Sequence, residues 1–449
     1  MGYLEFIKAA ANVKPSKRQL HTFSQVGFYA FIHFSPNTYT NLEWGLGNES
    51  PQIFNPVELD CDEWVDSIKS AGIKGVVITA KHHDGFCLWQ SKYTEHCMKN
   101  SPYKDGKGDI VRELAEACQR GGIEMGFYLS PWDRNSKYYG TDEYNTYYKN
   151  QLTELLTNYG KIFHVWFDGA CGEGPNGKRQ EYDFNGYIEI IRKLQPDATI
   201  FNDAGPDIRW CGNESGKARQ AEWAVVPCEL CHRAEVQTNG ALLQGDLSHM
   251  NNWDKDIGVI SNIVYSRGLV FCPSEVDMSI RPGWFYHPDE EPHSLERLFD
   301  TYINSVGANA SFILNIPPMP SGKFDCRDIK RLKELGDKIK NSFSDDFIRS
   351  SGTSVEFERL FGTQCAFKVA LPEKKKISYV VLQEDISRGQ RVESFKIYKR
   401  NRSGDWGSVY SGFTIGNKKI CPVNFVTDEI KIHITASRDE TLMKKISLY

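Results

Sequence analysis

The sequence predicts an α/β protein in which a (β/α)₈-like TIM barrel forms the catalytic domain and a C-terminal antiparallel β-sandwich follows it. Three observations lead to this fold class. Apolar, β-branched runs alternate with helical segments about every 35 to 50 residues, which implies parallel strands joined by crossovers. Most runs end in polar residues, as barrel strands do at the face that carries an active site. From about residue 352 the pattern changes to short alternating strands, so we place the domains at residues 1–345 and 346–449.

The first half of the barrel is predicted from four strand-like runs. Residues 1 to about 20 precede them as a helical, polar lead-in. The runs share an apolar, β-branched or aromatic core and cover residues 27–36, 75–85, 124–133 and 161–170. Helices with a 3.6-residue apolar period are expected between them, over residues 62–72, 109–121 and 143–159. Asp62 marks the start of the first helix, and Gly72 and Gly121 mark the ends of the first two.

The second half of the barrel follows the same alternation less regularly. A helix over residues 187–194 leads to a short strand at 198–203, and a long polar loop follows at 205–216. The remaining strands are expected at residues 269–275 and 310–318, and the remaining helices over 295–306 and 325–342. An open doubly wound sheet is the alternative topology, but no G-x-G-x-x-G motif follows the first strand.

The C-terminal domain is predicted from period-2 alternation of apolar and polar residues. Eight short strands are expected, over residues 355–360, 365–369, 377–382, 393–398, 408–410, 419–421, 429–434 and 445–449. No low-complexity linker separates this region from the barrel, so we expect the two domains to pack together.

Composition excludes several classes of protein. A hydrophobic content of 40% and a charged content of 25% describe an ordinary globular chain. The net charge of -4 offers no basic field, so no nucleic-acid partner is expected. No run approaches the roughly 18 consecutive apolar residues of a membrane span, so no membrane partner is expected.

The N-terminal residues do not form a signal peptide, because Glu5 and Lys8 interrupt the apolar region that a signal peptide needs. As written, the chain is expected to be cytoplasmic, although a removed secretion signal would leave its localisation open.

The 12 cysteines are scattered, and several lie in apolar segments, which favours buried, reduced thiols. Cys228, Cys231 and His232 form a C-x-x-C-H sequence that could attach haem or supply half of a zinc site. No second pair follows at finger-like spacing, and no export signal supports haem attachment. We interpret this segment as a local pair of loop thiols.

The polar strand ends carry the chemistry. Tryptophans interleaved with histidines and carboxylates suit a carbohydrate, because indole rings pack on sugar C–H faces while polar groups bond the hydroxyls. The residues collected in this way are His33, Glu43, Trp44, His82, His83, Tyr128, Trp132, Trp166, Asp168, Asn202 and Glu275. Glycoside hydrolysis needs two carboxyl groups. Asp168, at the end of a buried strand, suits the nucleophile, and the candidate acids are Glu214, Glu222, Glu229 and Glu275.

Three other classes compete with this interpretation. A metal-dependent barrel hydrolase could use His33, His82, His83 and Asp84, but adjacent histidines on a strand point to opposite faces, and no H-x-H or H-E-x-x-H motif is present. A non-catalytic carbohydrate-binding protein would use the same aromatic residues, but it does not need Asp168 behind Trp166. A Ser-His-Asp hydrolase lacks its G-x-S-x-G motif.

Several motifs together resemble the α-L-fucosidases of glycoside hydrolase family 29, in order over about residues 20 to 340. These motifs are Phe31-Ile-His33-Phe, Glu43-Trp44-Gly, Lys81-His82-His83-Asp84-Gly85-Phe86, Gly126-Phe-Tyr128-Leu-Ser-Pro-Trp, Val165-Trp166-Phe-Asp168-Gly169 and Arg281-Pro-Gly-Trp284-Phe-Tyr-His287. The resemblance implies a retaining exo-fucosidase without cofactor or metal, on a barrel followed by a β-sandwich. It implies that Asp168 is the nucleophile and that the pocket residues bind the sugar. These matched residues are His33, Glu43, Trp44, His82, His83, Tyr128, Trp166 and Trp284.

The segment from Asp207 to Gly216 resembles the one that carries the acid/base residue in the subgroup specific for α-1,3/4-linked fucose, and this makes Glu214 the acid/base. The segment from Leu382 to Val392 resembles that subgroup too. The implied substrate is fucose on GlcNAc in Lewis-type glycans, with a broad-specificity fucosidase as the alternative. The implied partner is a fucosylated oligosaccharide or glycoconjugate, and the chain is expected to be a monomer or weak homo-oligomer. The usual secretion signal is missing, and residues 228–232 follow no pattern of the family.

Overall fold

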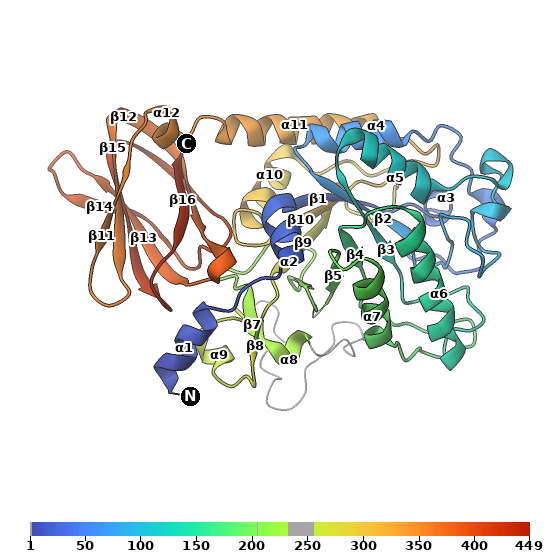
Figure 1. Ribbon diagram of the computed structural model, residues 1–449. Helices are drawn as coiled ribbons and strands as arrows, with labels where there is room; N and C mark the ends of the chain where they lie inside the picture. The colour runs from blue at the N-terminus through green and yellow to red at the C-terminus, as the bar shows by residue number, and fades with distance from the viewer. Residues whose placement is uncertain (1, 204, 232–255) are drawn as a thin grey trace.

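The fold consists of a closed barrel wrapped in helices and, beside it, a separate antiparallel sheet (Figure 1). The computed structural model describes residues 2–203, 205–231 and 256–449. The predicted fold class, a TIM barrel followed by a β-sandwich, is confirmed. The predicted domain boundary after residue 345 falls between α11 (Cys326–Phe343) and α12 (Phe347–Ser350), and it stays a prediction.

Eight parallel strands close the barrel in the order β1-β10-β9-β6-β5-β4-β3-β2. They are β1 (Phe28–Ile32), β2 (Gly75–Lys81), β3 (Glu124–Leu129), β4 (His164–Trp166), β5 (Thr199–Asn202), β6 (Ile208–Trp210), β9 (Ser274–Ser279) and β10 (Ser311–Asn315). Nearly every residue in them is buried, which explains why most of the strands, although not β6 and β9, are continuous apolar runs in the sequence.

Helices follow most of the barrel strands and cover the outer face (Figure 1). They are α4 (Cys61–Ser70), α5 (Ile110–Gly121), α6 (Asp142–Asn158), α7 (Phe184–Leu194), α10 (Leu295–Asn304) and α11. The helix predicted from Asp62 begins one residue earlier, because Asp60 is its N-cap and accepts hydrogen bonds from the backbone of Asp62 and Glu63. The shorter helical pieces are α3 (Asn37–Thr40), α8 (Cys228–Cys231), α9 (Ile260–Ile263), η2 (Pro51–Ile53), η3 (Met98–Asn100), η4 (Tyr103–Gly106) and η6 (Ile386–Arg388).

The barrel departs from the predicted pattern around β6. The predicted loop at residues 205–216 contains this strand, which pairs in parallel with β5 and β9 although only five residues separate it from β5. The predicted strand at 269–275 is two strands. β8 (Leu269–Phe271) pairs with β7 (Val225–Pro227) outside the barrel, while β9 is the barrel strand.

The C-terminal sheet has fewer and longer strands than expected. Its members are β11 (Val355–Arg359), β12 (Cys365–Glu384), β13 (Val392–Arg400), β14 (Trp406–Gly412), β15 (Lys419–Ser437) and β16 (Met443–Leu448). Four of the predicted strands merge in pairs into β12 and β15, which run antiparallel with shifts of register at two places. The apolar side chains of this sheet form a hydrophobic core of their own.

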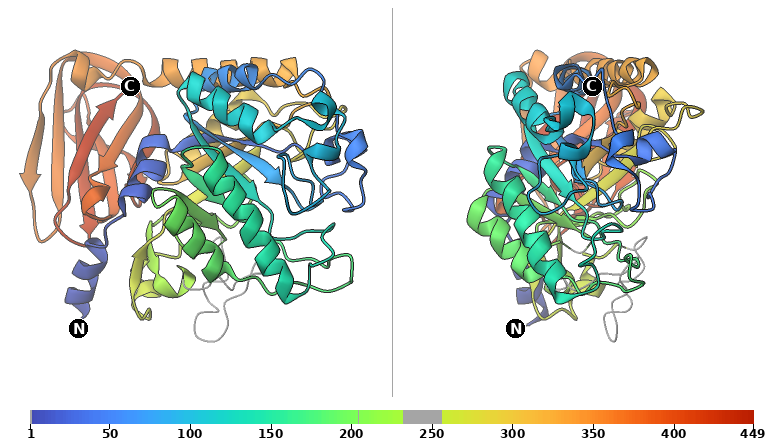
Figure 2. Two further views of the ribbon diagram at one scale, coloured as in Figure 1. Left: turned by 45° about the vertical axis from the view of Figure 1, so that its right-hand side comes forward. Right: turned by 90° about the vertical axis from the view of Figure 1, so that its right-hand side faces the viewer.

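The N-terminal lead-in starts below the C-terminal sheet and then passes between that sheet and the barrel (Figures 1 and 2). It comprises α1 (Tyr3–Ala11), α2 (Lys17–Gln19) and a π-helical stretch η1 (Leu20–Val26). Asn12 bonds to Asp439 and Arg391, and the Phe23 carbonyl accepts a hydrogen bond from Asn417. Phe23 also packs in an apolar cluster with residues of β7, β8 and η6. The first 26 residues therefore contact both parts of the chain, which also bond to each other directly, as the Asn417 backbone N–H does to Asn309.

Candidate active site

One small pocket gathers all ten of the site residues predicted from the sequence. Its volume is about 150 Å³, well below the roughly 300–1,000 Å³ of drug-sized sites, so it suits a small ligand. The lining residues are Phe31, His33, Glu43, Trp44, His82, His83, Tyr128, Trp166, Asp168, Ala170, Glu214, Asp277 and Trp284. Several of them follow or end barrel strands, where TIM barrels place their active sites.

Asp168 lies two residues after β4, with its side chain about one quarter exposed to the pocket. The Tyr128 hydroxyl donates a hydrogen bond to one carboxylate oxygen, Oδ2, at 3.0 Å. The Ala170 backbone N–H donates to the other, Oδ1, at 2.7 Å. Two donors from different segments therefore fix the carboxylate in one orientation.

His33 follows β1 and is held in one tautomer by Asn315. The Asn315 Oδ1 atom accepts hydrogen bonds from the His33 backbone N–H and from Nδ1, which lies 2.8 Å away. Its Nδ2 group donates to the Trp284 carbonyl and to Ser279. Burial lowers the pKa of His33 to about 3, so the ring is neutral at physiological pH. Because Nδ1 carries the proton, Nε2 is free to accept a hydrogen bond from a hydroxyl group.

His82 and His83 follow β2, and both rings are buried and neutral. Burial lowers the pKa of each ring, and the neighbouring ring lowers that of His82 further. Ser130 donates its hydroxyl hydrogen to the Trp132 carbonyl and therefore accepts from His83 Nδ1, 2.7 Å away. His83 Nε2, left as an acceptor, lies 3.8 Å from Asp168 Oδ2. A hydroxyl placed between them could donate to either atom.

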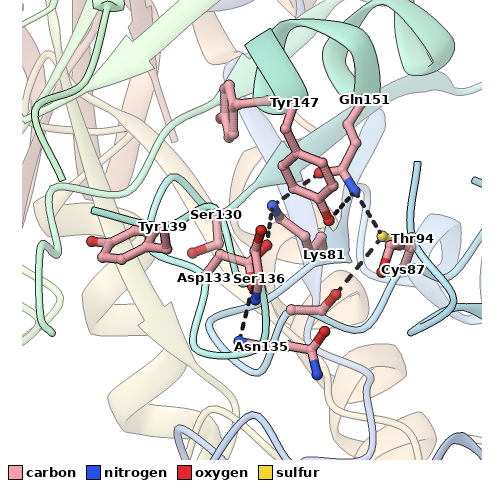
Figure 3. Close-up of polar contacts among 12 residues, drawn as sticks. Lys81, Cys87, Thr94, Ser130, Asp133, Asn135, Ser136, Tyr139, Tyr147 and Gln151 are labelled. Atoms are coloured by element: carbon pink, nitrogen blue, oxygen red, sulfur yellow. Dashed lines mark hydrogen bonds and ion pairs between the residues drawn. The ribbon is translucent and has the colours of Figure 1, made fainter. Parts of the chain in front are cut away.

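The residue before this histidine pair anchors the strand end. Lys81 is fully buried, and its ammonium lies 3.0 Å from Asp133 Oδ2 and 3.0 Å from Gln151 Oε1 (Figure 3). The rings of Tyr144, Tyr147 and Tyr148 surround it at 5.3–5.7 Å. The network ties β2 to α6 and to the segment after β3, so it holds the two histidines in place.

Glu43 contacts protein groups as well as the pocket. Its carboxylate accepts hydrogen bonds from the backbone N–H groups of Trp284 and Phe285 and lies 2.6 Å from His287 Nε2. It therefore attaches the loop of residues 41–49 to the segment that carries Trp284. A sugar hydroxyl that donates to Glu43 would have to use an acceptor position of the carboxylate that these three partners leave free.

The tryptophans occupy different depths. Trp166 is 7% exposed, stacks on Phe201 at 4.1 Å, and donates its indole N–H to Glu275 at 2.7 Å. One of its faces and its polar edge are therefore occupied. Trp44 is 59% exposed at the mouth of the pocket and contacts the rings of His83 and Trp132 edge to face. Trp44 has the free surface that stacking on a sugar requires.

Glu214 lies on the exposed loop that follows β6. Its pKa is raised, chiefly by the loss of solvent around its carboxyl and then by the negative charges of Asp168 and Glu43. A hydrogen bond from the Trp284 side chain acts in the opposite direction. A carboxyl group with a raised pKa is suited to donate a proton at neutral pH.

The other three candidate acids do not line the pocket. Glu222 is buried in ion pairs with Arg209 and Arg219. Glu229, at the start of α8, bonds to Ser266 and to the Arg267 backbone. Glu275 is completely buried and bonds to Trp166 and to the Tyr29 hydroxyl. The structure therefore leaves Glu214 as the only one of the four that lines the pocket.

Two carboxyl groups at this site were missed by the sequence analysis. Asp277 lines the pocket, accepts the Trp210 indole N–H at 2.9 Å, and has its pKa raised by burial to about 8. Asp203 lines an adjoining pocket of about 180 Å³ together with Asp168, Glu214 and Asp277. Burial raises its pKa to about 7. Asp277 could have been found from its spacing, because it lies two residues after Glu275 and so faces the barrel interior as well.

The structure offers no support for the metal-dependent alternative. Within the described ranges, no group of three or more histidine, cysteine, aspartate or glutamate side chains could hold a metal ion. The Cys231 side chain and His232 lie outside the residues whose side chains are described, whereas Cys228 is a free thiol. In that same part of the chain, no helix is long and apolar enough to cross a membrane.

A parallel eight-stranded barrel whose strand ends gather carboxyl groups, neutral histidines and tryptophans in one small pocket defines a glycoside hydrolase. The α-L-fucosidase family model matches residues 12–342. The chain is 39% identical to Alpha-L-fucosidase 1 of Arabidopsis thaliana, over 97% of its own length and 87% of that protein. It therefore belongs to the α-L-fucosidases, glycoside hydrolase family 29, and has their enzymatic activity.

Solved structures agree with this assignment. A Bacteroides ovatus protein superposes with a TM-score of 0.89 at 40% identity, over 100% of this chain and 76% of that one. A Ruminococcus gnavus GH29 fucosidase in complex with fucose gives a TM-score of 0.85 at 30% identity, over 98% of this chain and 95% of that one.

Proposed function

We propose that the protein is a retaining exo-α-L-fucosidase that releases α-1,3- or α-1,4-linked fucose from GlcNAc of Lewis-type glycans. The observation that carries the mechanism is that Asp168 and Glu214 line the same small pocket. Their environments differ: donors orient Asp168, whereas the surroundings of Glu214 raise its pKa. Two carboxyl groups with different environments are what a nucleophile and an acid require.

In the first step, an Asp168 oxygen attacks the anomeric carbon of fucose while the bond from that carbon to the leaving oxygen breaks. Glu214 transfers its proton to the leaving GlcNAc oxygen and becomes a carboxylate. The product is a fucosyl ester of Asp168. In the second step, Glu214 takes a proton from water, the water oxygen attacks the same carbon, and the ester bond breaks. Fucose leaves with its original anomeric configuration.

The histidines orient the sugar and do not transfer protons in this mechanism. His33 and His83 each have Nδ1 occupied by a protein acceptor, so each presents Nε2 as an acceptor for a fucose hydroxyl. Their low pKa values keep them neutral, which suits hydrogen bonds to a neutral sugar. Tyr128, Trp166 and Trp284 form the remaining walls, and Trp44 lies at the entrance.

The acid assignment is tested with Glu214→Ala. Hydrolysis of a Lewis trisaccharide should fall by about 10²- to 10⁴-fold, as expected when general acid catalysis is lost. A 4-nitrophenyl fucoside should keep much more of its rate of fucosyl transfer, because its leaving group needs no proton, and azide should restore its turnover. Lys217→Ala, on the same loop, is the matched control. If Asp277→Ala shows this pattern and Glu214→Ala does not, Asp277 is the acid.

The linkage is tested by comparing a Lewis trisaccharide, 2'-fucosyllactose and 4-nitrophenyl fucoside as substrates. Release of fucose from the Lewis sugar without turnover of 2'-fucosyllactose supports the narrow specificity. Good turnover of 2'-fucosyllactose would instead establish the broad-specificity alternative. Proton NMR of the first product separates the mechanisms, because a retaining enzyme releases α-fucose initially and an inverting enzyme releases the β-anomer.

The oligomeric state stays a prediction: we propose a monomer or weak homo-oligomer. Light scattering behind a size-exclusion column checks it, and a stable higher assembly at micromolar concentration would contradict it.

A further inference from the structure

A second and larger cavity lies outside the catalytic pocket. It is a groove of about 660 Å³ that shares no lining residue with the pocket. Its walls come from η2, the segment of residues 92–100, the segment of residues 135–138, and Tyr147 of α6. The lining residues are Pro51, Gln52, Lys92, Tyr93, Thr94, Glu95, His96, Asn100, Asn135, Ser136, Lys137, Tyr138 and Tyr147.

The composition of this groove is that of a saccharide-binding surface. Tyr93 and Tyr138 are 42% and 38% exposed, so each presents part of its ring to the groove. Amide and hydroxyl groups stand beside the rings, among them those of Asn135 and Ser136. Exposed aromatic faces with nearby hydrogen-bonding groups bind the C–H faces and hydroxyls of sugars.

The charge of the groove is positive. Glu95 is balanced by Lys99, whose ammonium lies 2.7 Å from its carboxylate. Among the described residues, neither Lys92 nor Lys137 forms an ion pair, and the Lys137 ammonium lies 5.1 Å from the centroid of the Tyr138 ring. His96 is 7% exposed, and its Nε2 atom has no hydrogen-bond partner in the described part of the chain. The two unbalanced cations favour an anionic group on the ligand, whereas the neutral His96, whose other ring nitrogen bonds to the Asp84 backbone, offers Nε2 as an acceptor for a ligand hydroxyl.

The floor of the groove is rigid. Asp133 accepts hydrogen bonds from the backbone N–H groups of Asn135 and Ser136 and is itself paired with Lys81 (Figure 3). The Tyr147 hydroxyl accepts a hydrogen bond from Gln151, which also bonds to Lys81. These buried contacts fix two walls before any ligand arrives, so binding would require little ordering of the protein.

We infer that this groove is a second carbohydrate-binding site for a saccharide that carries an acidic substituent, such as a sulfate ester or a carboxylate. The sugar rings pack on Tyr93 and Tyr138, and the acidic group lies between Lys92 and Lys137. This site goes beyond the proposed function and does not depend on it, because the ligand need not contain fucose or reach Asp168.

The test is isothermal titration calorimetry of the full chain with 6-sulfo-N-acetyllactosamine and with unsulfated N-acetyllactosamine. Saturating L-fucose is present throughout, so that the catalytic pocket is filled. The sulfated sugar should bind at least about tenfold more tightly than the neutral one, as a charge-assisted contact predicts. The double variant Lys92→Ala/Lys137→Ala and the variant Tyr138→Ala should each bind the sulfated sugar about tenfold or more weakly than the original protein. The control Lys333→Ala/Lys340→Ala removes two exposed cations of α11 and should change nothing.

The possible results separate clearly. Equal binding of the two sugars would overturn the acidic preference. No binding of the sulfated sugar at millimolar concentration, or binding that the control lowers as much as the double variant, would overturn the site. Sensitivity to the lysines but not to Tyr138→Ala or Tyr93→Ala would reduce the effect to simple charge attraction and would overturn the carbohydrate assignment. Unchanged turnover of 4-nitrophenyl fucoside by each variant shows that the protein is folded.

Discussion

Buried carboxyl groups occur in two parts of this barrel with opposite surroundings. Beside the pocket, Asp203 and Asp277 have their pKa values raised by burial to about 7 and about 8. Away from it, Glu222 is 1% exposed, yet its pKa is lowered, because Arg209 and Arg219 outweigh the effect of burial. All three side chains end in a carboxyl group. The presence or absence of a cationic partner therefore decides whether that group is ionised.

This difference separates two roles. A carboxylate clamped between arginines is a fixed charge, and Glu222 also accepts hydrogen bonds through its backbone carbonyl from Asn309 and Gln390, the latter in the C-terminal region. A carboxyl group without a cation keeps its proton near neutral pH. Protonated neighbours add little negative charge to the space that Asp168 also lines. Perturbed pKa values of this kind gather at functional sites.

The largest expected effect is the loss of catalysis in Asp168→Asn. In the proposed mechanism Asp168 is the nucleophile, and its loss prevents the covalent step, so kcat on 4-nitrophenyl fucoside should fall by about 10³-fold or more. The midpoint of thermal unfolding should not fall, because the side chain is partly exposed and the amide keeps a similar shape. Residual kcat within tenfold of the original value would remove Asp168 from its role.

The second effect concerns stability. Glu222→Gln removes the carboxylate charge that pairs with the buried Arg209 and Arg219, and it should lower the free energy of unfolding by about 3–5 kcal/mol. Urea titration followed by tryptophan fluorescence measures this change. Glu95→Gln, which breaks an exposed pair, is the control and should leave the midpoint unchanged. Equal effects of the two substitutions would contradict the structural role of Glu222.

Asp277→Asn should raise the free energy of unfolding, whereas Glu222→Gln should lower it. The folded-state pKa of about 8 lies above the ordinary value of 3.8, so the native state holds a proton that the unfolded chain loses in this range. Stability therefore falls as pH rises from about 4 towards 8, by up to roughly 1.4 kcal/mol per pH unit. The asparagine keeps an acceptor for Trp210 and should be more stable at pH 7, by about 1–4 kcal/mol.

Urea titrations at pH 4 and pH 7 check this prediction. The gain should vanish at pH 4, where the aspartate is protonated in the folded state and half-protonated in the unfolded chain. A variant that is less stable at pH 7 would show that the carboxylate form of Asp277 has a stabilising partner.

The smallest effect is expected for Tyr128→Phe. This change removes the hydroxyl that donates to Asp168 at 3.0 Å and leaves the ring in place. Loss of one hydrogen bond to a charged group costs about 1.5–3 kcal/mol, so kcat/KM should fall by roughly 10- to 150-fold. Tyr139→Phe, whose hydroxyl bonds to Tyr182 outside the pocket, is the matched control. An unchanged kcat/KM would mean that the Ala170 N–H alone orients the carboxylate.

The long, apolar strands of the barrel could be predicted from sequence, but β6 could not. It has only three residues, and one of them, Arg209, is completely buried because Glu222 neutralises it. A pattern based on polarity therefore predicts a loop there. The lengths of β12 and β15 could not be predicted for another reason. Changes of register interrupt the alternation of apolar and polar residues in them, so each was expected as two strands.

The site was predictable where it follows strand ends and unpredictable where it depends on loops. Asp168 and the histidines lie directly after strands, so their positions follow from the barrel rule. Glu214 could not be separated from Glu222 and Glu229 without the path of residues 211–229, which has no periodicity of its own. Here the resemblance to a family, and not spacing, selected Glu214.

The contacts of the lead-in segment also limit the order in which the protein can fold during its synthesis. Asn12 and Phe23 leave the ribosome early, yet their partners Arg391, Asn417 and Asp439 follow 379 to 427 residues later. Until then, the apolar cluster around Phe23 lacks Ile386, one of its five buried members. Contacts of such sequence separation form slowly, and exposed apolar surface favours aggregation in the meantime. A nascent chain that stops after the barrel would therefore depend on chaperones more than the finished protein does.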